Sequence, residues 1–286
     1  MSYRTILVHL NDSRRARRLL AYAAEVARSF EARLIGLHVS TRLRAPALPP
    51  SLLHDSVLSA LKFSIDEESH HLRSMFDEAT NSQRFTGEYR TVTAERTEPA
   101  TIVLARARAA DLIIASQTDP QWTLSSLLDF PDRLAIESGR PLVVLPNEKQ
   151  FSSLPTKVII AWNQSREAAR ALFDALPLIK GAKYVELLTF DQPESEARAD
   201  LQMDQDHLPA SAVAAALFDH GIKLTIATVK APSVKVGEQI CARAAEQQAD
   251  LVVMGAYGHT RFREFVFGGA TRHVLKNMPV PVLFSH

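Results

Sequence analysis

The sequence contains a single cysteine, only ten glycines, and no apolar run long enough to span a membrane. Cys241 alone excludes a disulfide framework, and a cytoplasmic location is expected. A transmembrane helix needs about twenty apolar residues, so we expect a soluble protein without a membrane partner. Met1 to Arg4 lead directly into an apolar run, so no secretion signal is expected.

An excess of either charge is also missing. The chain has 33 Lys and Arg against 32 Asp and Glu, a net charge of +1. This balance gives no electrostatic basis for binding nucleic acid. The paired His70 and His71 would point about 100° apart on a helix and have no further ligands at metal-binding spacing, so no metal site is predicted.

What the chain does have is length and internal repetition. Its 286 residues suit two domains of about 140 residues each. Asp111-Leu112-Ile113-Ile114 is repeated as Asp250-Leu251-Val252-Val253, and Arg140-Pro141-Leu142-Val143 as Val280-Pro281-Val282-Leu283. We therefore predict a duplicated α/β unit, with domains at residues 1–147 and 155–286.

Apolar runs alternate with amphipathic stretches through both halves. Strands are expected at 4–10, 34–39, 89–94, 112–115 and 142–145, then from 157 and at 184–190, 224–229, 250–254 and 280–284. Helices are expected at 14–30, 52–81, 98–109, 132–138, 166–178, 210–220, 236–247 and 270–277. Pro141 and Pro281 open the last strand of each half, which predicts edge strands open to pairing.

Glycine is concentrated in one loop of the second half. Gly255, Gly258, Gly268 and Gly269 lie between the expected strand at 250–254 and the helix at 270–277. Such a loop brings backbone N–H groups and a helix N-terminus close to an anion, so phosphate is the expected ligand. The spacing matches neither the Walker A loop nor the dinucleotide fingerprint. Alternatively, these four glycines bind no ligand and serve only to allow turns and tight packing of the helix on the strand.

The corresponding loop of the first half, residues 116–131, has no glycine. Asp119 and Asp129 would place carboxylates where a phosphate would lie, so this half should not bind ATP. The basic positions 14, 15, 17 and 18 are interpreted as the solvated face of the first helix.

The spacing Gly-x2-Gly-x9-Gly resembles the ATP-binding motif of the universal stress protein family, with Gly269 where that motif has Ser or Thr. The resemblance extends over nearly the whole chain, as a tandem of two such domains. It implies two doubly wound, five-stranded parallel sheets of order 3-2-1-4-5, an adenine nucleotide alpha hydrolase-like fold. It also implies pairing through the fifth strands, within one chain or between the chains of a homodimer.

The family further implies a nucleotide site in the second half. Ala161, Trp162 and Asn163 would meet the adenosine, and Thr189 and Phe190 would lie beside the base. The phosphates would be held around Met254, Gly255, Gly258, Gly268, Gly269, Ala270 and Thr271. We add Arg272. In the first turn of the helix its positive charge interacts unfavourably with the helix dipole, and a bound phosphate would compensate for this interaction.

Two functions follow. In the first, ATP, with or without Mg²⁺, is a regulatory ligand in the stress response, with AMP or ADP as alternatives. No catalytic residue is predicted: the loop lacks a lysine, a metal-binding carboxylate and a base for water, so at most slow hydrolysis is expected. In the second, the protein is a scaffold that binds no nucleotide and acts through its dimer surfaces.

Overall fold

The computed structural model describes residues 2–41, 55–81, 83–95, 97–190, 209–229, 235–257 and 269–286, without the side chains of 55–65. The predicted helix start at 52–54 and the loop residues 258–268 lie outside this description. The chain forms two compact units. The N-terminal unit comprises Tyr3–Ser138 and Gln150–Ser153; the C-terminal unit comprises Gly139–Lys149 and Leu154–His286, with Met1–Ser2. In the described ranges, no helix is long and apolar enough to cross a membrane.

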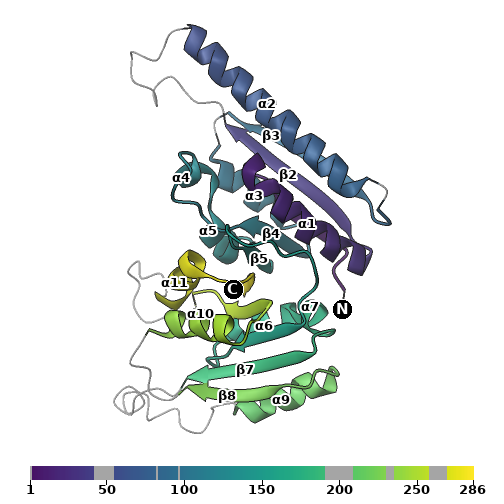
Figure 1. The fold of residues 1–286 in the computed structure, drawn as a ribbon, viewed down its shortest axis with the longest axis vertical. Helices are drawn as coiled ribbons and strands as arrows, with labels where there is room; N and C mark the ends of the chain where they lie inside the picture. Colours follow the sequence, from purple (N-terminus) through teal and green to yellow (C-terminus); the bar gives the residue numbers. More distant parts are fainter. Residues whose placement is uncertain are drawn as a thin grey trace. The chain divides into compact units, whose positions relative to one another are not determined.

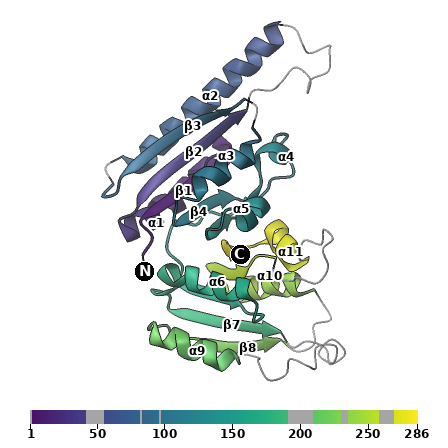
Figure 2. The ribbon, with the colours of Figure 1, turned by 180° about the vertical axis from the view of Figure 1, so that it is seen from behind.

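The N-terminal unit contains a parallel sheet of order β3-β2-β1-β4 (Figure 1). Its strands are β1 (Thr5–His9), β2 (Arg33–Thr41), β3 (Gly87–Ala94) and β4 (Leu112–Ser116). Its helices are α1 (Ser13–Phe30), α2 (Asp55–Thr80), α3 (Pro99–Ala107), α4 (Ser125–Leu128) and α5 (Pro131–Glu137). Helices α1 and α2 pack together on one face, and α3 and α5 on the other (Figure 2).

The C-terminal unit contains strands in the order β5-β10-β9-β6-β7-β8. They are β5 (Leu142–Leu145), β6 (Lys157–Ala161), β7 (Tyr184–Phe190), β8 (Thr225–Val229), β9 (Leu251–Gly255) and β10 (Val282–Ser285). The helices are α6 (Arg166–Asp174), α7 (Leu176–Ile179), α9 (Ala210–Asp219), α10 (Val236–Glu246) and α11 (Gly269–Asn277). All strand pairs are parallel except β5 with β10.

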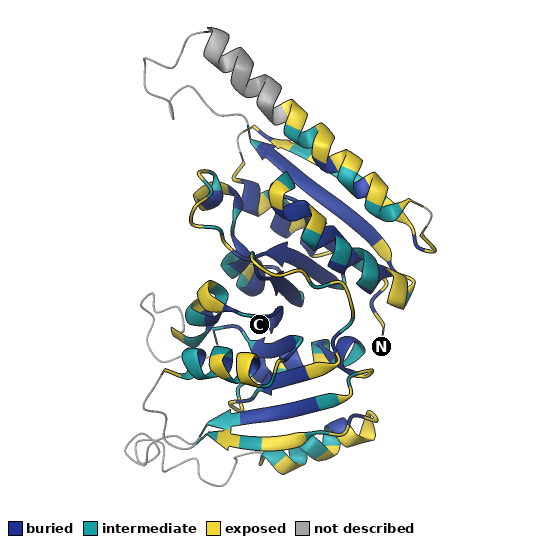
Figure 3. Ribbon diagram, viewed as in Figure 1, coloured by how far each residue is buried: buried dark blue, intermediate teal, exposed yellow. Residues whose placement is uncertain are grey.

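The predicted fold class is confirmed. When the strands of the second half, β6 to β10, are numbered 1 to 5 along the chain, their order β8-β7-β6-β9-β10 is the expected 3-2-1-4-5. Parallel neighbours need a crossover, and the intervening helices supply it on the two faces of the sheet. The inner strands are mostly dark in Figure 3, and every residue of β4 is buried.

The internal duplication is visible in matching hydrogen bonds. Asp111 Oδ2 accepts from the Thr5 N–H at 2.9 Å, and Asp250 Oδ2 accepts from the Lys157 N–H at 2.9 Å. These carboxylates tie the start of the fourth strand of each half to the first. Because the bond is the same in both halves, corresponding positions can be compared directly.

One expectation about the elements was wrong, and another was met by a pairing. A continuous helix over 166–178 divides into α6 and α7, because Pro177 lacks the N–H that a helix needs and its ring clashes with the preceding turn. The last strand of each half was expected at an edge open to pairing, and β10, last in the order β8-β7-β6-β9-β10, pairs with β5. Of the two pairings of fifth strands that the family resemblance implies, the antiparallel β5–β10 pair is the one within a single chain.

Candidate functional site

The carboxyl ends of β6, β7 and β9 meet in the C-terminal unit. Ala161 is in register with Leu188 of β7 on one side and with Met254 of β9 on the other. Ligands of parallel sheets bind beyond strand ends of this kind, where neighbouring connections leave on opposite faces. Thr189 and Phe190 follow on β7, both half-buried. Predicted site residues from three strands are therefore brought together.

The loop after β6 presents two different polar groups. Trp162 is buried, and among the described residues nothing accepts a hydrogen bond from its indole Nε1. Asn163 is exposed, and its Oδ1 accepts from the Ser165 N–H at 3.2 Å, which leaves Nδ2 as its donor. Ser165 then caps α6 by accepting from the Ala168 N–H at 3.1 Å. The loop thus offers a buried and an exposed N–H donor.

Gly255 has a packing role that the sequence did not specify. A Cβ at this position would lie 2.6 Å from the Ala168 nitrogen and 2.6 Å from the Glu167 carbonyl carbon, both backbone atoms of α6. By contrast, a Cβ at Gly269 would meet no atom of the described residues within 4 Å. Gly255 therefore permits close helix–strand contact, whereas Gly269 has no such packing role among the described residues. Gly258 and Gly268 lie outside the described residues.

The first turn of α11 carries the remaining predicted residues. Thr271 is buried, and its Oγ1 accepts from the Tyr257 N–H at 3.2 Å. Because that bond uses only an oxygen lone pair, the hydroxyl hydrogen can donate. Ala270 is half-buried and Arg272 is exposed. Tyr257 adopts a φ of 57°, a left-handed conformation that is uncommon without glycine.

A buried carboxylate lies close to this end of the sheet. Glu167, in the first turn of α6, is 5% exposed and pairs with the exposed Arg166. Burial opposes ionisation, but the hydrogen bond from Arg166 holds the pKa of Glu167 below its ordinary value. The described part of the chain contains no group of three His, Cys, Asp or Glu side chains that could hold a metal ion.

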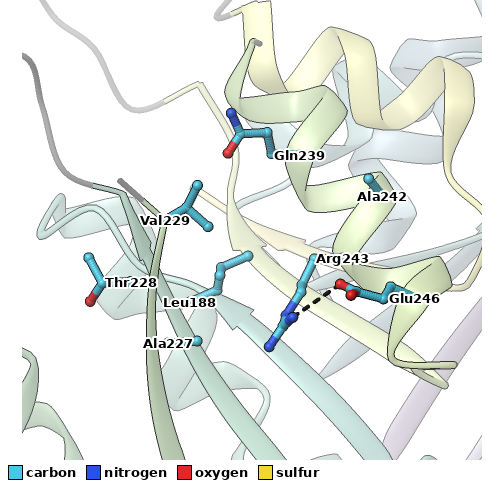
Figure 4. A pocket seen from close by; sticks show the side chains of 8 residues that line it. All are labelled: Leu188, Ala227, Thr228, Val229, Gln239, Ala242, Arg243 and Glu246. Atoms are coloured by element: carbon cyan, nitrogen blue, oxygen red, sulfur yellow. Dashed lines mark hydrogen bonds and ion pairs between the residues drawn. The ribbon is translucent and has the colours of Figure 1, made fainter. Parts of the chain in front are cut away.

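A cavity of about 290 Å³ lies one strand further along, between α10 and the ends of β7 and β8 (Figure 4). It is at the small end of the range of ligand pockets. Arg243 donates to both carboxylate oxygens of Glu186 at 2.8 Å and to Glu246 at 3.1 Å. The hydrogen bonds from Arg243, and next that from the Tyr184 hydroxyl, hold the pKa of Glu186 below its ordinary value. The cavity is lined by Leu188, Ala227, Thr228, Val229, Gln239, Ala242, Arg243 and Glu246, none of them predicted as site residues.

In the N-terminal unit, side chains of the unit itself occupy the corresponding crevice, the region at the carboxyl ends of β1 and β4. Arg15 forms a bidentate pair with Asp129, Nη1 to Oδ2 at 3.0 Å and Nη2 to Oδ1 at 2.9 Å. It also pairs with Asp12 and donates to the Gln117 carbonyl at 2.9 Å. Burial disfavours the cation, but Asp129 and Asp12 raise the pKa of Arg15 above its ordinary value.

This arrangement corrects the interpretation of the first helix. Arg14 and Arg17 are exposed as expected, but Arg15 is 3% exposed. Its position four residues before the buried Leu19 was the signal that sequence reasoning missed, because residues four apart share one face of a helix. Arg15 is therefore part of the crevice rather than of the solvated face.

Two buried histidines adjoin this crevice. His9 stacks on Phe130 with ring centroids 5.0 Å apart, and no described group bonds its Nε2. His38 Nδ1 lies 2.8 Å from the Leu10 carbonyl oxygen. Burial, followed by the charges of His38 and Arg15, lowers the pKa of His9 to about 3. His9 is thus neutral in the folded protein at ordinary pH.

Acid should therefore destabilise the protein. In the unfolded chain His9 has a pKa of 6.5, so at a pH between 6.5 and about 3 the unfolded chain binds a proton that the folded chain does not. The free energy of unfolding should fall below pH 6.5, approaching about 1.4 kcal/mol per pH unit. Urea unfolding across this range measures the slope. His9→Leu should flatten it and the exposed His220→Leu should not; equal slopes in all three proteins would contradict the assignment.

Together these features define a duplicated, doubly wound α/β protein, with Arg15 and Asp129 buried at the strand ends of its N-terminal unit. The model of the universal stress protein family matches residues 2–128 and 155–286. The chain belongs to the universal stress protein family, as two domains in tandem. Universal stress protein Slr1230 of Synechocystis sp. is 28% identical over 154 residues, which are 53% of this chain and 49% of that protein. The chain thus matches about half the length of this relative.

Solved structures support the same fold. A universal stress protein from Archaeoglobus fulgidus DSM 4304 superposes with a TM-score of 0.70 at 15% identity, covering 98% of this chain and 95% of its own. The functionally unknown protein PA1789 from Pseudomonas aeruginosa PAO1 gives 0.55 at 17% identity, covering 99% and 92%. At these identities the likeness concerns the fold.

Proposed function

We propose that this chain binds one adenine nucleotide, ATP in the first instance, in the crevice at the ends of β6, β7 and β9. The nucleotide acts as a regulatory ligand of a stress-response protein. The proposal assigns the adenosine to the loop after β6 and the phosphates to the start of α11. It also assigns the two domains to residues 1–147 and 155–286.

One comparison between the halves carries this proposal. Pro141 and Pro281, which precede the last strand of each half, are 140 residues apart. When the two halves are aligned on these prolines, Asp129 lies opposite Gly269. Asp129 fills the crevice of the N-terminal unit with a carboxylate, whereas a Cβ at Gly269 would meet no described atom within 4 Å. The buried N–H of Trp162 supports the same conclusion, because a buried donor without an acceptor costs about 1–3 kcal/mol. A ribose or phosphate oxygen would remove that cost.

No residue of the crevice is assigned a catalytic role. Thr271 and Asn163 would donate hydrogen bonds, and Arg272 would add positive charge. Glu167 is engaged by Arg166 and is not a base placed for water. Any hydrolysis of ATP should therefore be slow.

Calorimetric titration with ATP and Mg²⁺, run beside AMP and ADP, tests the proposal. We expect one site per chain with micromolar affinity, about −8 kcal/mol. Gly269→Asp should reduce the affinity at least about a hundredfold, since it places a carboxylate among the phosphates. Gly269→Asn is the matched control, nearly equal in size but uncharged. Both should fold, because a Cβ at position 269 would meet no described atom within 4 Å.

A scaffold that binds no nucleotide is the second candidate, and the packing of Gly255 favours it. That glycine is required between β9 and α6 whether or not a ligand binds. The same titration separates the two functions. No heat and no thermal stabilisation at millimolar ATP would contradict nucleotide binding and direct attention to protein partners.

A further inference from the structure

The crevice of the N-terminal unit is built to hold an anion. Two donors reach one carboxylate from the β1 end of the sheet, the guanidinium of Arg15 and the side-chain amide of Asn11. Two more come from the loop after β4: Ser125 Oγ at 2.9 Å and the Asp119 backbone N–H at 3.0 Å. All four converge on Asp129, whose side chain is fully buried.

The four groups that donate to Asp129, from Asn11, Arg15, Asp119 and Ser125, form a cradle, and neighbouring residues hold this cradle in place. Arg15 is fixed by Asp12 and by the Gln117 carbonyl, and its guanidinium carbon lies 4.8 Å from the centre of the Trp122 ring. Asn11 also donates to the Leu128 carbonyl at 3.2 Å. A cation and donors fixed in this way resemble a preorganised site for a carboxylate or phosphate group.

From this we infer that the Asp129 carboxylate is a built-in ligand, which occupies in the N-terminal unit the position that phosphate takes in an open crevice. The comparison rests on the phosphate position proposed for Gly269, 140 residues later, but the cradle and its test involve no ATP. The first strands of the two halves can be aligned by their matching hydrogen bonds, which place Thr5 opposite Lys157. In this alignment Asn11 corresponds to Asn163, and Arg15 corresponds to Glu167. The N-terminal unit therefore has a cation in its crevice where the C-terminal unit has a carboxylate.

A permanent internal ligand has a functional consequence. The N-terminal unit stays in its ligand-bound form at every nucleotide concentration, so only the C-terminal unit can respond to ATP. Removal of the carboxylate should convert the cradle into a site for small external anions.

Asp129→Ala tests this inference, with formate and inorganic phosphate as probes. At constant pH and ionic strength, the thermal midpoint of the variant should rise saturably with formate, by about 3 °C or more relative to chloride. Asp129→Asn is the matched control: it loses the charge but keeps the position filled, so it should not respond. The double variant Asp129→Ala with Arg15→Met should not respond either, because the cation is gone.

Each result has a defined meaning. A formate response equal in wild type, Asp129→Asn and Asp129→Ala would overturn the inference. If Asp129→Ala folds only with formate, the inference is supported; if formate does not recover folding, the cradle cannot take an external anion and the inference is wrong. Absence of ATP binding in the wild type would remove the proposed function and leave these outcomes unchanged.

Discussion

Arg15→Met is expected to lower the free energy of unfolding by about 3–5 kcal/mol. The substitution keeps much of the apolar stem but leaves the Asp129 carboxylate buried without its cation, and Asp12 with only the exposed Arg14. Removal of one partner from a buried ion pair is costly because the remaining charge has lost both water and its counterion. Urea unfolding of the whole chain at neutral pH measures the change.

Arg14→Met provides the control at the neighbouring position. The Arg14 side chain is 57% exposed; it donates to Asp12 at 3.3 Å and lies 3.7 Å from Asp119, and solvent screens both contacts, so its loss should cost about 0–1 kcal/mol. Equal losses for the two variants would show that the network around Asp129 contributes no more than a surface ion pair.

Gly255→Ala should destabilise the protein by about 3 kcal/mol. The added methyl group would overlap backbone atoms of Ala168 and Glu167, so β9 and α6 would have to move apart. A side chain could avoid the overlap by changing its rotamer, but the backbone atoms of a packed helix cannot. Thermal and urea unfolding report the loss, which should appear without any nucleotide present.

Gly269→Ala is the comparison for this glycine. Its methyl group would meet no described atom within 4 Å, and alanine at the start of a helix should change stability by less than about 0.5 kcal/mol. If Gly255→Ala were as stable as Gly269→Ala and impaired only ATP binding, the packing role of Gly255 would be wrong.

The sequence predicted the fold well because its signals are local and repeated. Apolar runs such as Leu112–Ser116 are long enough only for strands, and the helices between them require parallel order. The duplicated Asp111 and Asp250 marked equivalent positions, and both make the same bonds to the first strand. Family resemblance supplied the strand order.

The site was less predictable because its details depend on distant parts of the chain. That Gly255 touches α6 follows from the spacing between a strand and a helix about 90 residues apart, which no local pattern encodes. Asp129 was expected to repel phosphate, but its capture by Arg15 joins residues 114 positions apart. The cavity beside α10 likewise joins three elements, and its residues have no common motif.

The pairing of β5 with β10 bears on how this chain can be divided for expression. The family match stops at residue 128 and resumes at 155, so a fragment cut at those limits omits Leu142–Leu145. Such a fragment would expose the backbone of β10 along its length, and an open strand edge is a template for aggregation. A fragment of the second half that keeps β10 paired would therefore also have to contain Leu142–Leu145, which lie before the proposed domain start at residue 155.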